Sequence, residues 1–339
     1  MSGRTFIIAE LSANHGHSIE IAKESIRMAK ECGADAVKIQ TYTADTLTLD
    51  CDNRYFQIDT GTIWDGTTLY KLYQEAYTPW EWHKELFDYA KEIGIEIFST
   101  PFDKTAVDLL EELETPIYKI ASFEINDIPL IEYAASKGKP MIISTGVGTE
   151  EEIREAVEAC KKVGNNDITL LQCTSQYPAK LEDANLVMIK DLAERFCVKS
   201  GLSDHTMGSL VATTAVAMGA TVIEKHFIVD RNIGGPDSSF SMTPDEFKEM
   251  VENIRNVEKM IVNISYEITE KKKKSFKFKR SLFISKDIKK GEVLTEEHIK
   301  SVRPSDGISP KYYYKVLGKK ASKNLKFGEP LKFEDIEEE

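Results

Sequence analysis

VKSGLSDH at residues 198–205 and TVIEKHF at residues 221–227 are two short runs of strand-like composition, and each reaches a histidine at or next to its end. Residues 207–219 between them are rich in Ala, Val and Thr and suit a buried helix. This order predicts a parallel βα repeat, in which the carboxyl ends of neighbouring strands lie side by side. His205 and His226 would then meet at one rim. One such histidine alone is more often a hydrogen-bonding loop residue, but the pair favours a divalent-metal site.

The same alternation runs through most of the chain, because each β-rich run is followed by an amphipathic stretch of helical period. The expected strands are residues 6–11, 35–40, 95–100, 117–122, 140–145, 168–174, 198–204 and 221–227. The expected helices are residues 18–32, 79–93, 103–114, 127–137, 149–163, 185–196, 207–219 and 243–262. Eight such units predict a (β/α)8 (TIM) barrel. A doubly wound open sheet is the weaker alternative, because no GxGxxG motif follows the first strand.

Polar residues gather in the carboxyl halves of several expected strands. Buried parallel strands are normally almost wholly apolar. Polar residues at the same end of many strands therefore indicate an active-site rim. These residues are Glu10, Lys38, Gln40, Lys119, Ser122, Ser144, Lys225 and His226.

The composition of the 339 residues excludes some classes of protein. The apolar fraction of 41% suits a packed globular chain, and the net charge of −12 argues against a nucleic-acid partner. The five cysteines form no CxxC pair, which predicts free thiols and a reducing compartment. No signal peptide or membrane-spanning stretch is recognisable, so we expect no membrane partner and a cytoplasmic location.

We expect three segments along the chain: a barrel domain at residues 1–265, a charged linker at 266–280, and a small domain at 281–339. Within the small domain, residues 281–285 predict a strand, and TEEHIKSVR at 295–303 opens with a helix-capping pattern. A domain this small has a limited core, so we expect it to pack against another surface.

The connection between the second and third expected strands, residues 41–78, is unusually long and rich in aromatic residues. It could serve as a lid, a substrate wall or a dimer contact. The helix that follows is expected to take Thr78 as its N-cap and Pro79 in its first turn.

Five motifs together resemble the sialic acid synthase family: IAELSANH (8–15), VKIQT (37–41), YKIASFE (118–124), GLSDH (201–205) and IEKHF (223–227). The C-terminal segment resembles the small antifreeze-like (SAF) domain of that family, so the resemblance covers essentially the whole chain. It implies an enzyme that condenses phosphoenolpyruvate (PEP) with the open-chain form of an N-acylated aminosugar. The implied products are a nine-carbon 2-keto acid and phosphate.

Within the family, WDGTTLY (64–70) and TPWEWH (78–83) resemble the branch that makes pseudaminic acid. Ser175 points the same way, because the neuraminate branch typically has Asn there. The implied sugar is 2,4-diacetamido-2,4,6-trideoxy-L-altrose. N-acetylneuraminate and legionaminate synthases, which use other N-acylated hexosamines, are the alternatives within the family.

The resemblance also implies roles for single residues. Around PEP it places Lys38, Thr100, Lys119, Ser122, Ser144 and Ser203. On the sugar side it places Gln40, Tyr177 and Asp237. Glu124 and Glu10 are the candidate acid/base residues, although Glu10 could equally form an ion pair with Lys38 or Lys119. Two converging lysines suit a dianion in a barrel mouth.

The implied cofactor is Mn²⁺ or Mg²⁺ on His205 and His226, where it would polarise the sugar aldehyde. The implied assembly is a domain-exchanged homodimer in which Arg303 reaches the neighbouring barrel. His15 could lie at the rim or be structural, whereas His17, His83 and His298 are expected at the surface.

Two other classes of protein remain open. A Schiff-base aldolase is also a barrel with lysines at strand ends, and borohydride trapping of a lysine would identify it. A non-catalytic sugar-binding module has little use for a histidine pair beside two lysines, and a lack of phosphate release with every candidate sugar would favour it.

Overall fold

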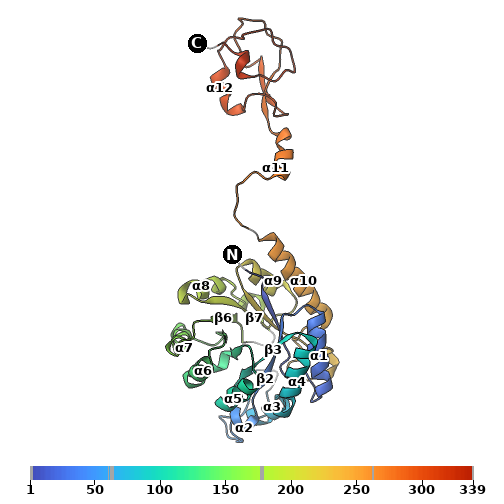
Figure 1. The fold of residues 1–339 in the computed structure, drawn as a ribbon, viewed down its shortest axis with the longest axis vertical. Helices are drawn as coiled ribbons and strands as arrows, with labels where there is room; N and C mark the ends of the chain where they lie inside the picture. Colours follow the sequence, from blue (N-terminus) through green and yellow to red (C-terminus); the bar gives the residue numbers. More distant parts are fainter. Residues whose placement is uncertain (1–2, 60, 62–64, 176–178, 262, 338–339) are drawn as a thin grey trace. The chain divides into compact units, whose positions relative to one another are not determined.

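The computed structural model describes residues 3–59, 61, 65–175, 179–261 and 263–337. It divides into two compact units, residues 1–262 and 263–339, which are described here one at a time (Figure 1).

The first unit is a closed barrel. In the described part of the chain, eight parallel strands pair in sequence order, and the last pairs with the first, so that Glu10 lies opposite His226. The strands are β1 (Phe6–Glu10), β2 (Ala36–Thr41), β3 (Glu96–Pro101), β4 (Tyr118–Ile120), β5 (Met141–Ser144), β6 (Ile168–Cys173), β7 (Lys199–Asp204) and β8 (Val222–His226). The predicted (β/α)8 barrel is confirmed.

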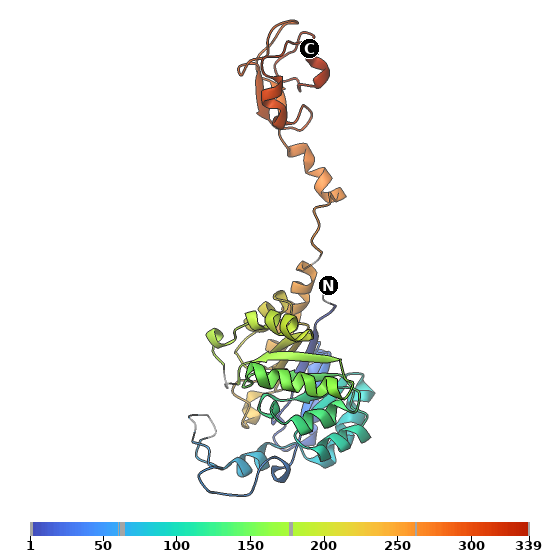
Figure 2. The ribbon, with the colours of Figure 1, turned by 90° about the vertical axis from the view of Figure 1, so that its left-hand side faces the viewer.

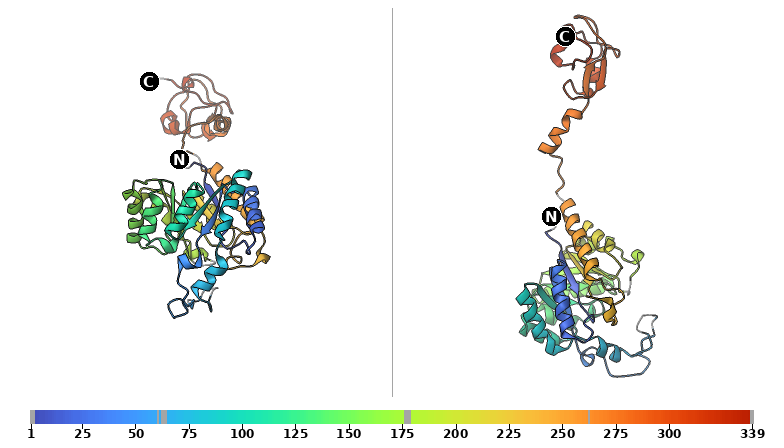
Figure 3. Two further views of the ribbon diagram at one scale, coloured as in Figure 1. Left: turned by 60° about the horizontal axis from the view of Figure 1, so that its bottom comes forward. Right: turned by 90° about the vertical axis from the view of Figure 1, so that its right-hand side faces the viewer.

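Helices surround the strands, as the left view of Figure 3 shows. They are α1 (Ile19–Glu31), α4 (Trp80–Ile93), α5 (Lys104–Glu112), α6 (Ile128–Ala135), α7 (Glu150–Lys162), α8 (Val187–Phe196), α9 (Leu210–Ala217) and α10 (Pro244–Met260). Two more, α2 (Ala44–Leu47) and α3 (Leu69–Ala76), lie in the long aromatic connection, which forms a separate lobe at the carboxyl end of the strands (Figure 2).

Local sequence explains where these helices begin. The Ser18 side chain caps α1 by accepting from the Ile21 amide, and Thr149 forms a capping box with Glu152 at α7. The cap expected for α4 was wrong. Its N-cap is Pro79, because the helix begins one residue later than predicted, at Trp80, and no side chain caps it.

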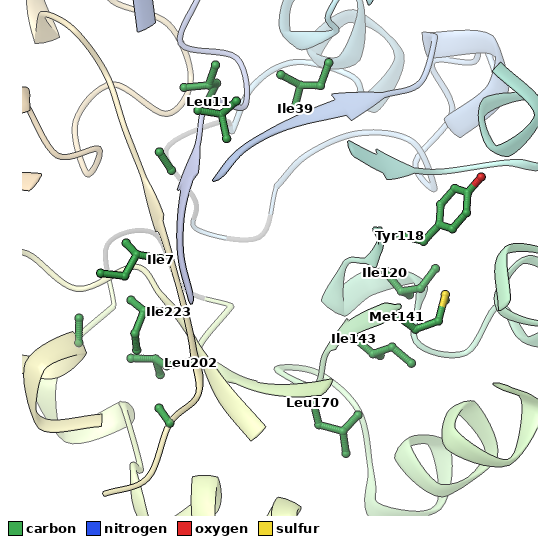
Figure 4. Packing of buried hydrophobic residues seen from close by; sticks show 14 of the residues in the cluster. Ile7, Leu11, Ile39, Tyr118, Ile120, Met141, Ile143, Leu170, Leu202 and Ile223 are labelled. Carbon is green, nitrogen blue, oxygen red and sulfur yellow. The ribbon is translucent and has the colours of Figure 1, made fainter. Parts of the chain in front are cut away.

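The barrel strands have two kinds of buried position, as their period of two requires. Outward side chains such as Ile7, Ile120 and Ile223 pack with residues of the helices in one large apolar cluster (Figure 4). Inward side chains such as Ile8 and Val222 form a second cluster inside the barrel. That inner cluster also contains Ala36, Phe98, Ile142 and Leu171.

The inward positions change from apolar to polar along several strands. In β8 the inward series is Val222, Glu224 and His226, and in β1 Ile8 is followed by Glu10. The apolar layer therefore closes the amino-terminal part of the barrel, and the polar layer forms its mouth at the carboxyl ends.

Gly201 is the inward residue of β7 at the level of this apolar layer. A Cβ atom there would lie 2.3 Å from the carbonyl oxygen of Val222 and 2.8 Å from Cδ2 of Leu171. Glycine at this position therefore allows β7 to lie close against β8 above Leu171.

The second unit has its own small core around Leu282, Ile284, Leu294, Ile299 and Leu331. Its strands β9 (Ser281–Ile284) and β10 (Ile299–Val302) pair antiparallel, and its helices are α11 (Glu270–Lys274) and α12 (Tyr313–Val316).

The helix predicted at residues 295–303 was wrong. Thr295 and His298 do bond to each other, but they form a turn, and β10 follows it directly. Pairing with β9 and burial of Ile299 outweigh the local capping signal. Among the residues that the structure describes, no helix combines the length and apolar character needed to cross a membrane.

Candidate active site

Two buried lysines share one buried carboxylate at the mouth of the barrel. Lys38 Nζ lies 3.0 Å from Glu224 Oε1 and 3.1 Å from Glu10 Oε2. Lys119 Nζ lies 3.4 Å from the same Glu224 oxygen. All four side chains are at most 4% exposed, so their formal charges balance almost out of contact with water.

Burial favours the neutral form of each of these groups, but the ion pairs overcome it at two of them. At Glu224 the two lysines outweigh burial and lower the carboxyl pKa to about 2. Burial also opposes the charge of Lys38, yet Glu10 and Glu224 raise its pKa. Burial raises the pKa of Glu10 and lowers that of Lys119. Glu224 is thus ionised and is the ion-pair partner that both lysines share.

Glu224 was not among the predicted site residues, although a signal for it exists. Glu224 and His226 are two residues apart and must face the same side of β8, so an inward His226 implies an inward Glu224. Lys225, which the sequence analysis placed at the rim, faces the other way.

Lys225 instead forms a second buried ion pair behind the strands. Its Nζ lies 2.6 Å from Asp204 Oδ2, and both side chains are at most 2% exposed. The other oxygen of Asp204 accepts hydrogen bonds from the amide and hydroxyl of Thr206, and Lys225 donates to the Thr206 carbonyl. This network fixes the backbone on both sides of His205.

His205 and His226 meet at the rim, with ring centroids 5.2 Å apart. Nδ1 of His205 lies 2.8 Å from the Thr174 carbonyl, which makes Nδ1 the protonated nitrogen and Nε2 the one with the lone pair. Burial, and then the neighbouring His205, hold the pKa of His226 well below its ordinary value. His226 Nδ1 is 3.9 Å from Asp237 Oδ2.

This pair fits a divalent metal, because a ligating histidine usually donates its second nitrogen to a carbonyl or carboxylate. No group of three or more His, Cys, Asp or Glu residues is placed to hold a metal within the described ranges. The two histidines would therefore leave the remaining ligand positions to water and substrate.

Gln40 and Asp237, two of the residues predicted on the sugar side, belong to one chain of hydrogen bonds. Gln40 Nε2 donates to Glu10 Oε1 and to Ser12 Oγ, each at 3.0 Å. Ser12 donates to Asp237 across 2.5 Å. Ser12 was missed by the sequence analysis, and its left-handed backbone (φ 43°) turns the chain directly after β1.

A cavity of about 530 Å³ lies beside these hydrogen-bonded residues, and its lining includes Gln40, Glu124, His226 and Asp237. Glu124 ends the 3₁₀ turn η1 (Ser122–Glu124) after β4. Burial raises the pKa of Glu124 to about 7, so this carboxyl can gain or lose a proton near neutral pH.

The other predicted residues around PEP also lie in the mouth. Thr100 accepts from Lys38 at 3.3 Å, Ser203 donates to Glu224 at 3.2 Å, and Ser122 accepts from the Gly146 amide at 3.1 Å. Ser144 ends β5 and is buried.

Two predicted site residues cannot be placed in the mouth. Tyr177 lies outside the described residues, and Arg303 belongs to the second unit, just after β10.

Two histidines outside the motif pair are buried. His15 is 4% exposed and packs edge-on against Trp82, 5.5 Å away, which is a structural contact. The surface position predicted for His83 was wrong. Its side chain is fully buried, because its two ring nitrogens bond to Thr41 Oγ1 at 2.8 Å and to the Pro79 carbonyl at 3.1 Å.

A barrel mouth with paired lysines, a histidine pair and a carboxyl of raised pKa is that of an enzyme acting on an anionic substrate. The NeuB family model matches residues 25–266, and the SAF domain model matches residues 279–337. The chain belongs to the NeuB family.

Individual relatives differ in how similar they are to this chain. The chain is 51% identical to pseudaminic acid synthase of Helicobacter pylori, over 98% of this chain and 97% of the relative. It is 38% identical to N,N'-diacetyllegionaminic acid synthase of Legionella pneumophila, over 98% and 94%. The crystal structure of N-acetylneuraminic acid synthetase from Leptospira borgpetersenii superposes with a TM-score of 0.72 at 32% identity, covering 80% of this chain and 90% of that one.

The raised pKa of Glu124 predicts a carboxyl that is protonated below pH 7 and ionised above it. Infrared difference spectra between pH 6 and pH 8 should show loss of a protonated carboxyl band, and Glu124→Gln should remove most of that signal. Cys173→Ser is the control, because it changes another buried side chain of the mouth that is not a carboxyl, and it should keep the band. An unchanged band in Glu124→Gln would contradict the assignment.

Proposed function

We propose that this chain is a pseudaminic acid synthase. It would condense PEP with open-chain 2,4-diacetamido-2,4,6-trideoxy-L-altrose and release phosphate. The observation that carries the choice of branch is the 51% identity to the Helicobacter pylori pseudaminic acid synthase along nearly the whole chain, against 38% to the legionaminic acid relative.

The lysine pair supports PEP as the first substrate. PEP brings a phosphate and a carboxylate into a mouth where Lys38 and Lys119 are already held by Glu224. Both lysines lie beside the same carboxylate, so two positive charges are close together where the anion would bind. Hydroxyl groups of Thr100, Ser122, Ser144 and Ser203 would complete its hydrogen bonds.

The chemistry follows from the two substrates. C3 of PEP attacks the aldehyde carbon of the sugar, and the aldehyde oxygen takes up a proton. Water adds to C2 of PEP and gives up a proton, and the tetrahedral intermediate then loses phosphate by cleavage of its C–O bond. Glu124 is the group that we assign to these proton transfers, since its pKa of about 7 lets it act in either direction. Glu10, held by Gln40 and Lys38, would orient the sugar.

We propose that His205 and His226 hold Mn²⁺ or Mg²⁺. When bound, the metal would polarise the aldehyde oxygen of the sugar as a Lewis acid. The carbonyl partner of His205 supports this role because it orients the ring and leaves Nε2 to face the metal, and the low pKa of His226 supports it because a neutral imidazole is the ligating form.

The metal assignment predicts a loss of ion binding in two single variants. His205→Ala and His226→Ala should each weaken Mn²⁺ binding at least about tenfold, measured by electron paramagnetic resonance of the free ion, because each removes one of the protein ligands. His17→Ala, which changes an exposed histidine, should bind Mn²⁺ like the wild type. A chelator should abolish turnover, and Mn²⁺ or Mg²⁺ should restore it. Normal Mn²⁺ binding in both rim variants would refute the site.

The choice of branch predicts the preferred sugar. With PEP and Mn²⁺, phosphate release from the diacetamido-trideoxy-altrose should exceed that from N-acetylmannosamine by about a hundredfold or more in kcat/KM, since discrimination against an added hydroxyl and a missing acetamido group must combine. Equal efficiency on both sugars would contradict the branch. Borohydride with pyruvate or with the nine-carbon 2-keto acid should trap no lysine adduct, and a trapped lysine would favour an aldolase instead.

We also propose a domain-exchanged homodimer, in which residues 266–280 carry the small domain to the other barrel. Charge favours docking of the linker: residues 263–280 contain 7 Lys and Arg against 2 Asp and Glu, whereas residues 281–339 contain 12 against 11 and residues 1–262 contain 25 against 43. A basic linker is attracted to an acidic barrel. In this arrangement Arg303 would bind the sugar held by the neighbouring subunit. The enzyme would work in the cytoplasm, where its five free cysteines stay reduced.

Mixed dimers test this exchange. Arg303→Ala and His226→Ala chains should each be nearly inactive alone. After co-refolding, half of the dimers should be mixed, with one intact site each, so roughly a quarter of wild-type activity should return. Demonstrated mixed dimers without recovered activity would mean that Arg303 does not serve the neighbouring barrel. As a control, a chain carrying both substitutions should restore nothing when mixed with either single variant.

A further inference from the structure

Helix α3 has an apolar face that the protein core does not use. Leu69, Leu72, Tyr73 and Ala76 recur at the spacing of one helical face. None of the residues of α3 is buried, although the apolar face of a surface helix normally packs into the core. The set of these four residues is called the α3 stripe below.

The α3 stripe lines the cavity above the reactive carboxyls. All four of its residues are cavity residues, together with Leu47 and Ile58 from the same connection. The lining on the barrel side includes Ser12, Gln40, Glu124, His226 and Asp237. The α3 side of the cavity is therefore apolar, whereas the barrel side combines these polar groups with apolar residues such as Phe102 and Phe123.

The position of this apolar wall is held by specific contacts. Ile58 exchanges two backbone hydrogen bonds of 3.0 Å with the segment just before α3, to Thr67 and from Gly66. Tyr73 packs edge-on against Tyr42, with ring centroids 5.8 Å apart, and Tyr42 is 3% exposed. The stripe is thus a built surface of the cavity rather than the exposed face of an unattached helix.

We propose that the α3 stripe is the subsite that binds the methyl-bearing substituents of the sugar and sets the enzyme's selectivity among them. This inference rests on the proposed function. A sugar with a deoxy C6 methyl and two acetamido groups offers apolar ends beside polar ones, which matches the two walls of the cavity. An unsubstituted hexose would leave the stripe in contact with water.

The test replaces Leu72 in the middle of the stripe. Leu72→Asn keeps a similar size but adds an amide, so it should raise the KM for the diacetamido-trideoxy-altrose about tenfold or more. The KM for PEP and the kcat should stay within about twofold, because the polar wall is unchanged. If an acetamido methyl meets the stripe, Leu72→Ala should also improve the relative use of sugars with N-propanoyl groups, since it leaves more room.

Two sugar analogues show which methyl group meets the stripe. If the C6 methyl does, Leu72→Asn should lower the preference for the 6-deoxy sugar over its 6-hydroxy analogue. If an acetamido methyl does, the variant should lower the preference for the diacetamido sugar over its 4-amino analogue. Either result supports the subsite.

The control is Lys71→Ala, an exposed position on the same helix, which should leave every constant unchanged. Circular dichroism should show native folding of each variant, and Leu69→Asn is the replacement if Leu72→Asn does not fold. Folded variants with unchanged sugar KM and selectivity would overturn the subsite alone. A wild-type enzyme that releases no phosphate with any of these sugars would overturn the proposed function and the subsite together.

Discussion

Lys38, Glu224 and Lys119 form a buried charge network on which the rest of the barrel mouth depends. Burying an ion costs several kcal/mol unless it is paired, so each lysine can stay charged here only beside a carboxylate. Glu224 supplies that partner to both, and Glu10 gives Lys38 a second one. Glu10 also connects this network, through Gln40 and Ser12, to Asp237. The lysine pair and the Gln40, Ser12 and Asp237 chain are thus parts of one set of contacts.

Much of the barrel could be predicted because strand periodicity and rim polarity are local signals. The histidine pair followed from two strands of similar length, joined by one helix. Glu224 was not predicted as a site residue, although it lies two residues before His226 in β8 and must therefore face the same side of the strand. Ser12 contacts Asp237, which is 225 positions away in the sequence, and His83 contacts Thr41, which is 42 positions away. No local pattern reveals such contacts. In the small domain, the pairing of β10 with β9 overrode a local capping signal.

The long connection between β2 and β3 lines the cavity at the barrel mouth without adding a residue to the apolar cluster inside the barrel. Its helix α3 contributes no buried residue, yet it supplies the apolar wall of the cavity. Loops at the carboxyl ends of strands can change in this way because the layers beneath them carry the stability of the fold. The aromatic content of this connection was evident from the sequence, but the aliphatic residues that line the cavity were not.

The close contact between Gly201 and Val222 also affects His205 and His226, each of which lies four residues further along its segment. A single hydrogen in place of a methyl group lets β7 lie against β8 where Val222 and Leu171 leave no further room. Both strands continue from that point toward His205 and His226. The distance between the strands therefore helps to set the distance between the two imidazoles. A methyl group at this depth would work as a spacer and widen the rim from below. The composition of the apolar layer therefore affects the distance between His205 and His226 at the rim.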